Sequence, residues 1–445
     1  MTTPQVPNAS DAPRWLQTLR YTLNPLGYMD RAFERCGDFF NAPVIGNHSQ
    51  VIFASHPDTI QAIFSSDALT APSNQLLRPI VGDYSVFGLA GQRHRRERKL
   101  LMPPFHREQI TTYGDLICDL TTKALEPLSI GDTVTARVLV QDISIEVILR
   151  VVFGLNEGPR FDQLKALLVE FSERIQNPLF ISALFIPILQ KDWGKLTPWG
   201  YLKSLQRRIS QLLYAEIQDR RSQAPGQDIL SLLMAAKDED GQPMSAEELH
   251  DELLTLLLAG HEATTNAIAW ALYWVHRTPL VLEELQSELE GVNADQPMAL
   301  AESPYLNAVC NETLRISTVA FLSFPREVAE PINLQGYSLE PGTRIYACIY
   351  LAHRRPEIYP DPEQFRPERF LERKYSMSEF LPFGGGSRRC IGDVLAQYEM
   401  KLILATLLAR HHFALTREAP ETPTRRGVNV APASGVQMTV QEIKA

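Results

Sequence analysis

The sequence predicts a mainly α protein with one long central helix and a small β region. Ser245-Ala-Glu-Glu248 has the pattern of a helix capping box, and no proline follows it until Pro279. About 33 residues at a rise of ~1.5 Å each make a helix of about 50 Å, which has to cross the centre of the protein. Further helical patterns fill roughly residues 108–237, whereas short alternating stretches occur only near 41–55, 334–352 and 413–440.

Composition narrows the class of protein. The 445 residues are 44% hydrophobic and 21% charged, which is ordinary for a globular chain with a large core. A net charge of −9 and the lack of a long basic tract argue against a nucleic-acid partner. The N-terminal residues lack the basic and apolar regions of a signal peptide, and no uncharged apolar run reaches 18 residues. Five scattered cysteines without Cys-x-x-Cys spacing fit a reduced protein, so we expect a cytoplasmic location and no transmembrane segment.

The first hundred residues alternate between regular and irregular patterns. Short helices are expected over 15–36 around Pro25, a hairpin over 41–55 and a helix over 57–64. Residues 70–90 form an irregular apolar loop, which either contacts a ligand or packs on the surface. The residues that we assign to a candidate substrate pocket are Leu76, Leu77, Ile80 and Phe87, together with Phe321 further along the chain. The apolar stretch 178–199 is either a lid over a ligand channel or a buried connection.

A glycine-rich loop around Cys390 carries the strongest chemical pattern. Gly384-Gly385-Gly386 precede the cysteine, and an apolar helical pattern follows from Val394. Free N–H groups at a helix N-terminus favour a thiolate, and glycines allow a flat ligand to approach the backbone. With Arg388 as a nearby cation, the loop suits an iron porphyrin with anionic propionates. A phosphate-binding loop is disfavoured because no Gly-Lys-Ser/Thr follows.

This loop resembles the heme-binding signature of the cytochrome P450 family, Phe-x-x-Gly-x-Arg-x-Cys-x-Gly. Every defined position is present, from Phe383 through Arg388 and Cys390 to Gly392. The resemblance implies heme b as cofactor, with Cys390 as the axial ligand of its iron. It covers about residue 30 to the end, with five motifs in family order. It therefore implies the P450 fold, in which one domain (residues 1–445, with about 25 peripheral N-terminal residues) surrounds a buried heme.

Other motifs of the family match more loosely. A basic helix over 91–100 places His94 and Arg98 one turn apart, where the family has two contacts to heme propionates, although a solvated charged helix is the alternative. Arg326 matches a further propionate contact. Glu312, Arg315 and Arg369 match the buried Glu-x-x-Arg and Pro-Glu-Arg-Phe network of the family and are expected to be structural.

The middle of the long helix resembles the oxygen-activation motif of the family, with one departure. Gly260 and Glu262 match, but Ala263 stands where the first threonine belongs, and Thr264 matches the second. Thr264 lies about 100° further round a helix, so ordinary proton delivery is in question. Water with Glu262, a substrate group, or a local bulge that brings Thr264 into place are the alternatives. A bond from the hydroxyl to the preceding turn is the structural interpretation for Thr264 and Thr265, and we favour it for Thr265.

Together these features predict a heme-thiolate monooxygenase that hydroxylates an apolar substrate with O2. The apolar loops imply an apolar substrate. Motif style and the apolar stretch 178–199 resemble the branch of the family that contains long-chain fatty-acid and alkane hydroxylases, so a long-chain fatty acid or alkane is the expected substrate and a terpenoid is the alternative. A peroxide-using or isomerising heme enzyme and a non-catalytic heme-binding protein remain as other classes. No flavin or nicotinamide motif was found, so we expect a monomer that receives electrons from a separate ferredoxin and ferredoxin reductase. Arg388, Arg389 and the Arg95-Arg96-Lys99 cluster are the candidate basic patch for that partner.

Overall fold

The computed structural model describes residues 4–48, 50–74, 77–175, 190–192, 194–224, 226–293 and 296–444. The chain folds as two compact units, each assembled from three separate segments. The first unit comprises Met1–Pro72, Ala308–Cys390 and Pro423–Ala431, and the second comprises Ser73–Asn307, Ile391–Thr422 and Pro432–Ala445. The single domain expected over 1–445 stays a prediction.

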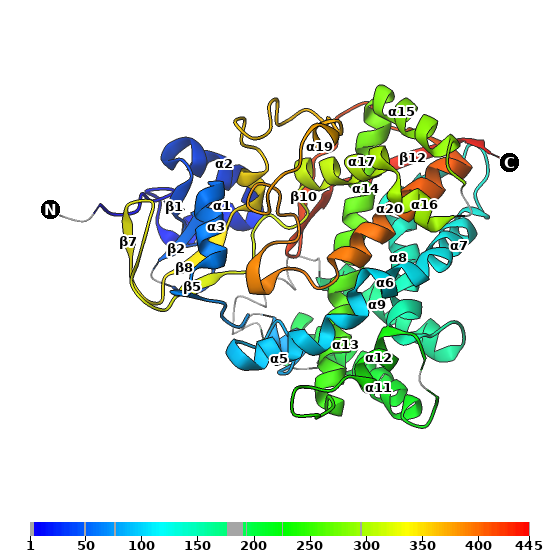
Figure 1. The fold of residues 1–445 in the computed structure, drawn as a ribbon, viewed down its shortest axis with the longest axis horizontal. Helices are drawn as coiled ribbons and strands as arrows, with labels where there is room; N and C mark the ends of the chain where they lie inside the picture. Colours follow the sequence, from blue (N-terminus) through cyan, green and yellow to red (C-terminus); the bar gives the residue numbers. More distant parts are fainter. Residues whose placement is uncertain are drawn as a thin grey trace. The chain divides into compact units, whose positions relative to one another are not determined.

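The first unit is built on a five-stranded mixed sheet with the strand order β1-β2-β8-β5-β3 (Figure 1). The hairpin expected over 41–55 is present, although Val44 and Ile45 lie in the connection and not in a strand. Strand β2 pairs in parallel with β8, with Val51 opposite Arg344. The elements of this unit are β1 (Phe39–Asn41), β2 (Val51–Ala54), β3 (Leu69–Thr70), β5 (Arg326–Val328), β6 (Ile332–Leu334), β7 (Tyr337–Leu339), β8 (Arg344–Ala347), β10 (Pro423–Arg426), β11 (Asn429–Pro432), α1 (Arg14–Leu23), α2 (Pro25–Cys36), α3 (Pro57–Ser65), α18 (Ile349–Ala352), α19 (Arg369–Glu372) and η5 (Gly386–Arg388).

One correction concerns residues 334–352, which were expected to form one small sheet around the turn at Pro341-Gly342. Strand β7 pairs with β6, whereas β8 joins the five-stranded sheet. Residues Ile349–Ala352 then form helix α18. Alternation of apolar residues marks strands but does not identify their partners, which explains the error.

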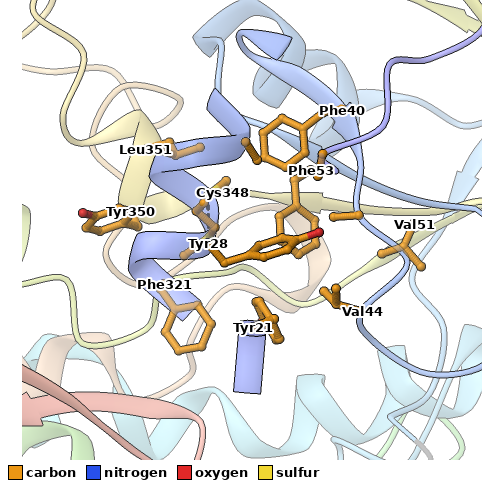
Figure 2. Packing of buried hydrophobic residues seen from close by; sticks show 14 of the residues in the cluster. Tyr21, Tyr28, Phe40, Val44, Val51, Phe53, Phe321, Cys348, Tyr350 and Leu351 are labelled. Carbon is orange, nitrogen blue, oxygen red and sulfur yellow. Dashed lines mark hydrogen bonds between the residues drawn. The ribbon is translucent and has the colours of Figure 1, made fainter. Parts of the chain in front are cut away.

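An aromatic core fills the first unit beside the sheet (Figure 2). The ring of Tyr21 lies 5.8 Å from Tyr28 and 6.3 Å from Phe321, in edge-to-face arrangements. Phe40 and Phe53 are fully buried in the same cluster. Phe321 is therefore a core residue of this unit.

The second unit is predominantly helical, as predicted. Helix α8 packs against α13 and α14, and α20 packs against α7 and α14. A three-stranded sheet of β4, β12 and β9 closes the unit and contains both strands expected near the C-terminus. The elements are α4 (Arg78–Val81), α5 (Gly91–Leu101), η1 (Pro103–Phe105), α6 (Arg107–Ile110), η2 (Thr111–Tyr113), α7 (Gly114–Leu125), α8 (Ala136–Phe153), α9 (Pro159–Ile175), η4 (Gly194–Leu196), α11 (Pro198–Arg220), α12 (Ile229–Ala235), α13 (Ala246–Gly260), α14 (Glu262–Arg277), α15 (Pro279–Glu290), α16 (Pro297–Glu302), α20 (Asp393–Arg410), β4 (Thr133–Thr135), β9 (His411–Leu415) and β12 (Gln437–Ile443). Helix α17 (Pro304–Ile316) runs from this unit into the first.

The long helix expected after Ser245 is present but divided. The capping box forms as predicted, since the Ser245 side chain accepts the Glu248 N–H and the Glu248 side chain accepts the Ser245 N–H. Helix α13 ends at Gly260 and α14 begins at Glu262, with His261 at φ −104° between them. The fully buried His261 ring makes a 2.7 Å contact through Nδ1 with the Leu257 carbonyl oxygen at this break. The prediction of one unbroken helix was therefore wrong at this turn, where the local geometry is distorted.

Candidate active site

The cysteine loop is closed by a backbone hydrogen bond. The Cys390 N–H donates to the Phe383 carbonyl at 3.0 Å, and Gly384 and Gly386 adopt positive φ angles of 67° and 62°. Cys390 is exposed, whereas Cys310 and Cys348 are buried and Cys36 and Cys118 are partly buried. Helix α20 begins three residues later, as predicted. The loop thus presents one accessible thiol on a tightly turned backbone.

The glycines of this loop are required by close neighbours. A Cβ atom on Gly385 would lie 2.4 Å from the Phe64 ring, and one on Gly386 would lie 2.8 Å from an Arg326 nitrogen. Arg326 donates to the Gly385 carbonyl at 2.9 Å, and its guanidinium lies over the Phe64 ring at 5.2 Å. Strand β5 and helix α3 therefore fix the loop that carries Cys390.

Arg326 is a buried cation that faces carbonyl oxygens. It is 3% exposed, and it donates to the carbonyls of Phe324, Pro325 and Gly385. No acidic side chain among the residues that the structure describes forms an ion pair with it, and burial lowers its pKa to about 10. A buried arginine normally has an anionic partner. An anionic ligand such as a heme propionate fits this arrangement.

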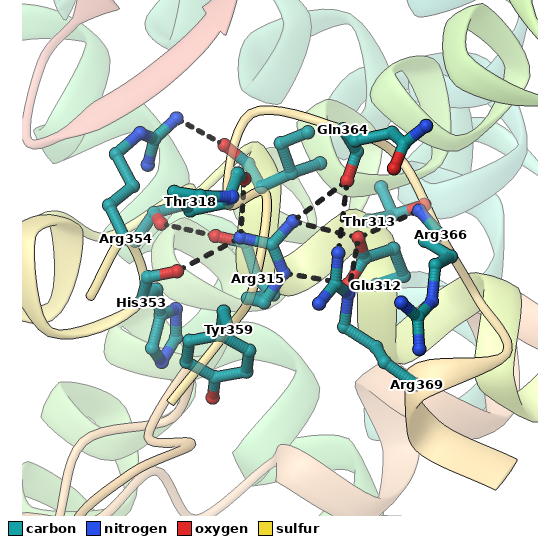
Figure 3. A network of polar contacts seen from close by, with 12 residues as sticks. Glu312, Thr313, Arg315, Thr318, His353, Arg354, Tyr359, Gln364, Arg366 and Arg369 are labelled. Carbon is teal, nitrogen blue, oxygen red and sulfur yellow. Dashed lines mark hydrogen bonds and ion pairs between the residues drawn. The ribbon is translucent and has the colours of Figure 1, made fainter. Parts of the chain in front are cut away.

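Behind the loop, Glu312, Arg315 and Arg369 form the expected buried network (Figure 3). Arg315 binds both Glu312 oxygens at 2.7 Å, and Arg369 binds Oε1 at 3.1 Å. Arg315 also donates to the His353 and Pro362 carbonyls at 2.9 and 2.8 Å. Glu312 and Arg315 are completely buried. The network ties α17 to the proline-rich segment before α19.

His353 connects this network to the cysteine loop, and sequence reasoning missed it. Its carbonyl accepts from Arg315, while its Nε2 accepts the Leu381 N–H at 2.9 Å. The Leu381 carbonyl in turn accepts the Gly384 N–H. Burial lowers the pKa of His353 well below its usual range, which keeps Nε2 an acceptor. A lone histidine in the sequence gives no sign of such a role.

In the second unit, helix α5 has a buried and a charged side. His94 is buried and Arg98, one turn later, is partly buried, whereas Arg95 and Lys99 are exposed. Arg96 forms ion pairs with Asp238 at 2.7 Å and with Glu248 at 3.0 Å, and Lys99 pairs with Glu239 at 2.6 Å. The helix is therefore not solvated on all sides, and two members of the predicted basic cluster are already neutralised.

The turn between α13 and α14 contains the residues of the predicted oxygen-activation motif. A Cβ on Gly260 would lie 2.7 Å from Ile148, so glycine permits the close approach of α8. Glu262 accepts from the Ser172 hydroxyl at 2.8 Å and lies 3.9 Å from Arg137. Thr264 Oγ1 donates to the Gly260 carbonyl at 3.3 Å.

The expected bond to the preceding turn therefore occurs at Thr264. At Thr265, where we favoured it, the buried hydroxyl has no partner in the described part of the chain. Burial lowers the pKa of His261, so its ring is neutral at ordinary pH.

The family of this chain follows from comparison with known proteins. The sequence model of the cytochrome P450 family matches residues 9–440. The chain belongs to the cytochrome P450 family. Cytochrome P450 135B1 of Mycobacterium tuberculosis (strain H37Rv) is 32% identical, over 98% of this chain and 91% of that protein. Cytochrome P450 135A1 of the same strain is 31% identical, over 97% of this chain and 94% of that protein.

A solved P450 structure confirms the fold. Retinoic-acid-bound cyanobacterial CYP120A1 matches the whole of this chain with a TM-score of 0.86 and 25% sequence identity. This P450 is thus a heme b monooxygenase, which uses O2, an apolar substrate and a redox partner. Among the described residues, no helix is long and apolar enough to cross a membrane, and no three metal-ligating side chains gather.

The apolar loop of this P450 (residues 70–90) is joined to α13 by three hydrogen bonds that the sequence did not predict. The N–H groups of Tyr84 and Val86 donate to Asp251 at 2.8 Å and Glu252 at 2.6 Å, and Thr255 donates to Ser85 at 2.7 Å. Within the loop Ile80 is buried and Leu77 and Phe87 are partly buried. Leu76 and most of the expected lid over 178–199 lie outside the described residues.

Proposed function

We propose that this P450 hydroxylates a long apolar carboxylic acid, with a long-chain fatty acid as the first candidate. Lys203 carries this proposal. On α11 it donates to the carbonyl of Pro79, next to buried Ile80 in the apolar loop. Burial lowers the pKa of this partly buried lysine, as expected for a cation without full solvation. Among the described residues, its hydrogen-bond acceptors are the uncharged Pro79 carbonyl and Gln206 amide oxygens, and a substrate carboxylate would add a directly paired counter-charge.

A second observation supports a carboxylic acid as substrate and is compatible with a terpenoid. The structural neighbour CYP120A1 is bound to retinoic acid, which is an isoprenoid carboxylic acid. Arg78, the other cation near the loop, already pairs with Asp83 at 2.6 Å and is about half exposed. Lys203 is therefore the better candidate anchor. An alkane is a weaker candidate substrate, because it has no charge that could pair with Lys203.

We assign the site residues as follows. Cys390 would ligate the heme iron, while Phe383 and Gly392 frame its loop and Arg326 would pair with a propionate. His94, Arg98 and Arg388 are proposed as further cofactor contacts. The bound heme supplies the oxygen chemistry, and its thiolate ligand favours cleavage of the O–O bond. We assign four residues at the turn between α13 and α14 to oxygen activation: Gly260, Glu262, Ala263 and Thr264.

Proton delivery in this P450 does not use the first threonine of the family motif. Ala263 has no hydroxyl, and the hydroxyl of Thr264 is bonded to Gly260. Glu262 is held by Ser172 and Arg137, and it is the acidic side chain of the turn. We propose that Glu262 moves the proton, assisted by water. A peroxide-using enzyme would not need this step and would turn over without a reductase.

We propose a separate ferredoxin and ferredoxin reductase as the electron source, acting on a monomer in the cytoplasm. The candidate basic patch is smaller than predicted, because Arg388 is buried and donates to the carbonyls of Ala71 and Pro72. Exposed Arg95 remains, and Arg389 is partly exposed.

The substrate proposal is tested by titrating the heme spectrum with a long-chain fatty acid, its methyl ester and a neutral sesquiterpene. We expect the free acid alone to shift the Soret band towards high spin. Lys203→Met should weaken binding of the acid by about tenfold, the loss of one ion pair, while Arg78→Met serves as the matched control and should not. Equal shifts with ester and sesquiterpene would contradict a carboxylate anchor and favour a neutral terpenoid.

A further inference from the structure

Helix α1 exposes an apolar stripe and buries Gln17 and Tyr21 on its other side. Trp15, Leu19 and Leu23 are 68%, 47% and 74% exposed and follow one another at intervals of four residues, which places them on one stripe. Gln17 and Tyr21 lie on the opposite side and are buried. This orientation is the reverse of a normal surface helix, whose apolar stripe faces the core.

The inverted orientation is fixed by specific contacts. The Gln17 amide donates to the carbonyls of Ser10 at 3.1 Å and Ala12 at 2.7 Å, and it accepts from the Tyr28 hydroxyl at 2.8 Å. Tyr21 packs in the aromatic core (Figure 2). Rotation of α1 to hide the stripe would break all of these contacts. The apolar stripe is therefore built into the fold of the first unit.

The charges on α1 are all positive. Arg14 and Arg20 lie on either flank of the stripe, both are exposed, and the helix contains no acidic residue. Neither arginine forms an ion pair in the part of the chain that the structure describes; Arg14 donates to the Gly46 carbonyl at 2.5 Å. This local positive charge contrasts with the net charge of −9 of the chain.

The β10–β11 hairpin lies against α1 and adds one exposed apolar side chain beside it. Arg425 of the hairpin lies over the Tyr21 ring at 5.6 Å, which places the hairpin against α1. At the hairpin turn, Val428 is 66% exposed, whereas Arg425 and Arg426 are partly buried.

From these observations we infer that α1 docks on the surface of an anionic lipid bilayer. Leucine and tryptophan enter the interface between headgroups and acyl chains, while flanking arginines bind anionic headgroups. A second copy of the chain is a poorer partner for this stripe. A stable protein interface needs about 20–30 residues a side, and the stripe has three. The surface would bring the enzyme to the phase in which long apolar substrates concentrate.

The test uses the full heme-loaded chain and sedimentation with vesicles of phosphatidylcholine, alone or mixed equally with phosphatidylglycerol. We expect the wild type to bind the mixed vesicles, more strongly at low salt than at high salt. Leu19→Gln/Leu23→Gln should lower binding by at least about tenfold. Arg20→Gln should weaken binding to the anionic vesicles alone.

A matched control separates the stripe from general surface hydrophobicity. Leu371 and Leu280 are 51% and 77% exposed, close to the values for Leu19 and Leu23, and lie on other helices. Leu371→Gln/Leu280→Gln should bind vesicles like the wild type, and all variants should keep the wild-type heme spectrum. The inference is overturned if the wild type does not bind vesicles or if both double variants lose binding equally. It is also overturned if the wild type forms a lipid-independent dimer that Leu19→Gln/Leu23→Gln abolishes, because the stripe would then be a protein interface.

Discussion

The guanidinium of Arg326 donates a 2.9 Å hydrogen bond to the carbonyl oxygen of Gly385, in the loop that leads to Cys390. The same side chain lies over Phe64, whose ring occupies the space that a side chain at position 385 would need. One buried arginine thus shapes the cysteine loop and supplies beside it a positive charge that no described acidic side chain pairs with.

Arg326→Met should therefore weaken heme retention. The variant loses the bond to Gly385 and the cation offered to a propionate, so we expect heme loss at least about tenfold faster, as for the loss of one charged hydrogen bond. Transfer of heme to an excess of a heme-scavenging protein measures this rate. Arg344→Met is the control, because Arg344 pairs with Glu327 on the same sheet and does not contact the loop. Identical rates for the two variants would contradict the role of Arg326.

Removal of Glu312 should destabilise the protein strongly. Glu312→Ala leaves two buried arginines without their carboxylate, which costs of order 3–5 kcal/mol in the free energy of unfolding. Glu239→Ala, which breaks the exposed pair with Lys99, should leave the free energy of unfolding almost unchanged. Urea unfolding of both heme-loaded variants provides the comparison. A small effect of Glu312→Ala would show that the network does not support the fold.

At the turn between α13 and α14, Glu262→Gln should reduce coupling more than Thr264→Ala. Thr264 donates to a backbone carbonyl, whereas Glu262 keeps an ionisable carboxylate. The measurement is product formed per electron pair consumed, once a substrate is identified. Ala263→Thr should raise this ratio if the missing hydroxyl limits proton delivery. If Thr264→Ala alone abolishes coupling, the proposed role of Glu262 is wrong.

The buried carboxyl group of Glu97 should make stability depend on pH. Burial, with the charge of Glu248, raises the pKa of Glu97 from 4.5 to about 7. Because the folded pKa is raised, this contribution to stability is complete below pH 4.5 and is lost as pH rises through 7. The shift corresponds to at most about 3 kcal/mol. In Glu97→Gln, the free energy of unfolding should fall less between pH 5 and 8 than in the wild type, whereas Glu283→Gln, at an exposed site, should follow the wild type.

Arg95→Glu should slow reduction by an acidic ferredoxin, and the difference from the wild type should shrink at high salt because screening weakens surface attraction. Arg96→Glu is unsuitable for this test, since it would break the pairs with Asp238 and Glu248. Arg31→Glu, at an exposed position of α2, makes the same change in net charge and serves as the control. A reduction rate that is unchanged in Arg95→Glu but salt-sensitive would place the partner elsewhere.

Local patterns were enough to predict many elements. The capping box at Ser245, the helices around Pro25 and the two strands β9 and β12 each depend on residues close in the chain or on simple alternation, although the pairing of β9 with β12 was not predicted. The pairing of β8 with β2 was not predictable, because it joins residues almost 300 positions apart. The same holds for His353, whose two contacts come from residues 38 and 28 positions away.

The sequence by itself determined the family, the cofactor and the cysteine loop, because turn glycines, a reactive thiol and their spacing are encoded locally. Only the tertiary structure decided which charged side chains are free to bind a ligand or a partner and which are already paired within the chain. It placed Arg388 against backbone carbonyls, neutralised Arg96, and buried Arg326 with no carboxylate partner in the described ranges of the chain. It also turned Gln17 inward and Trp15 outward on α1. Burial and pairing depend on contacts between distant segments, and a linear pattern does not specify them.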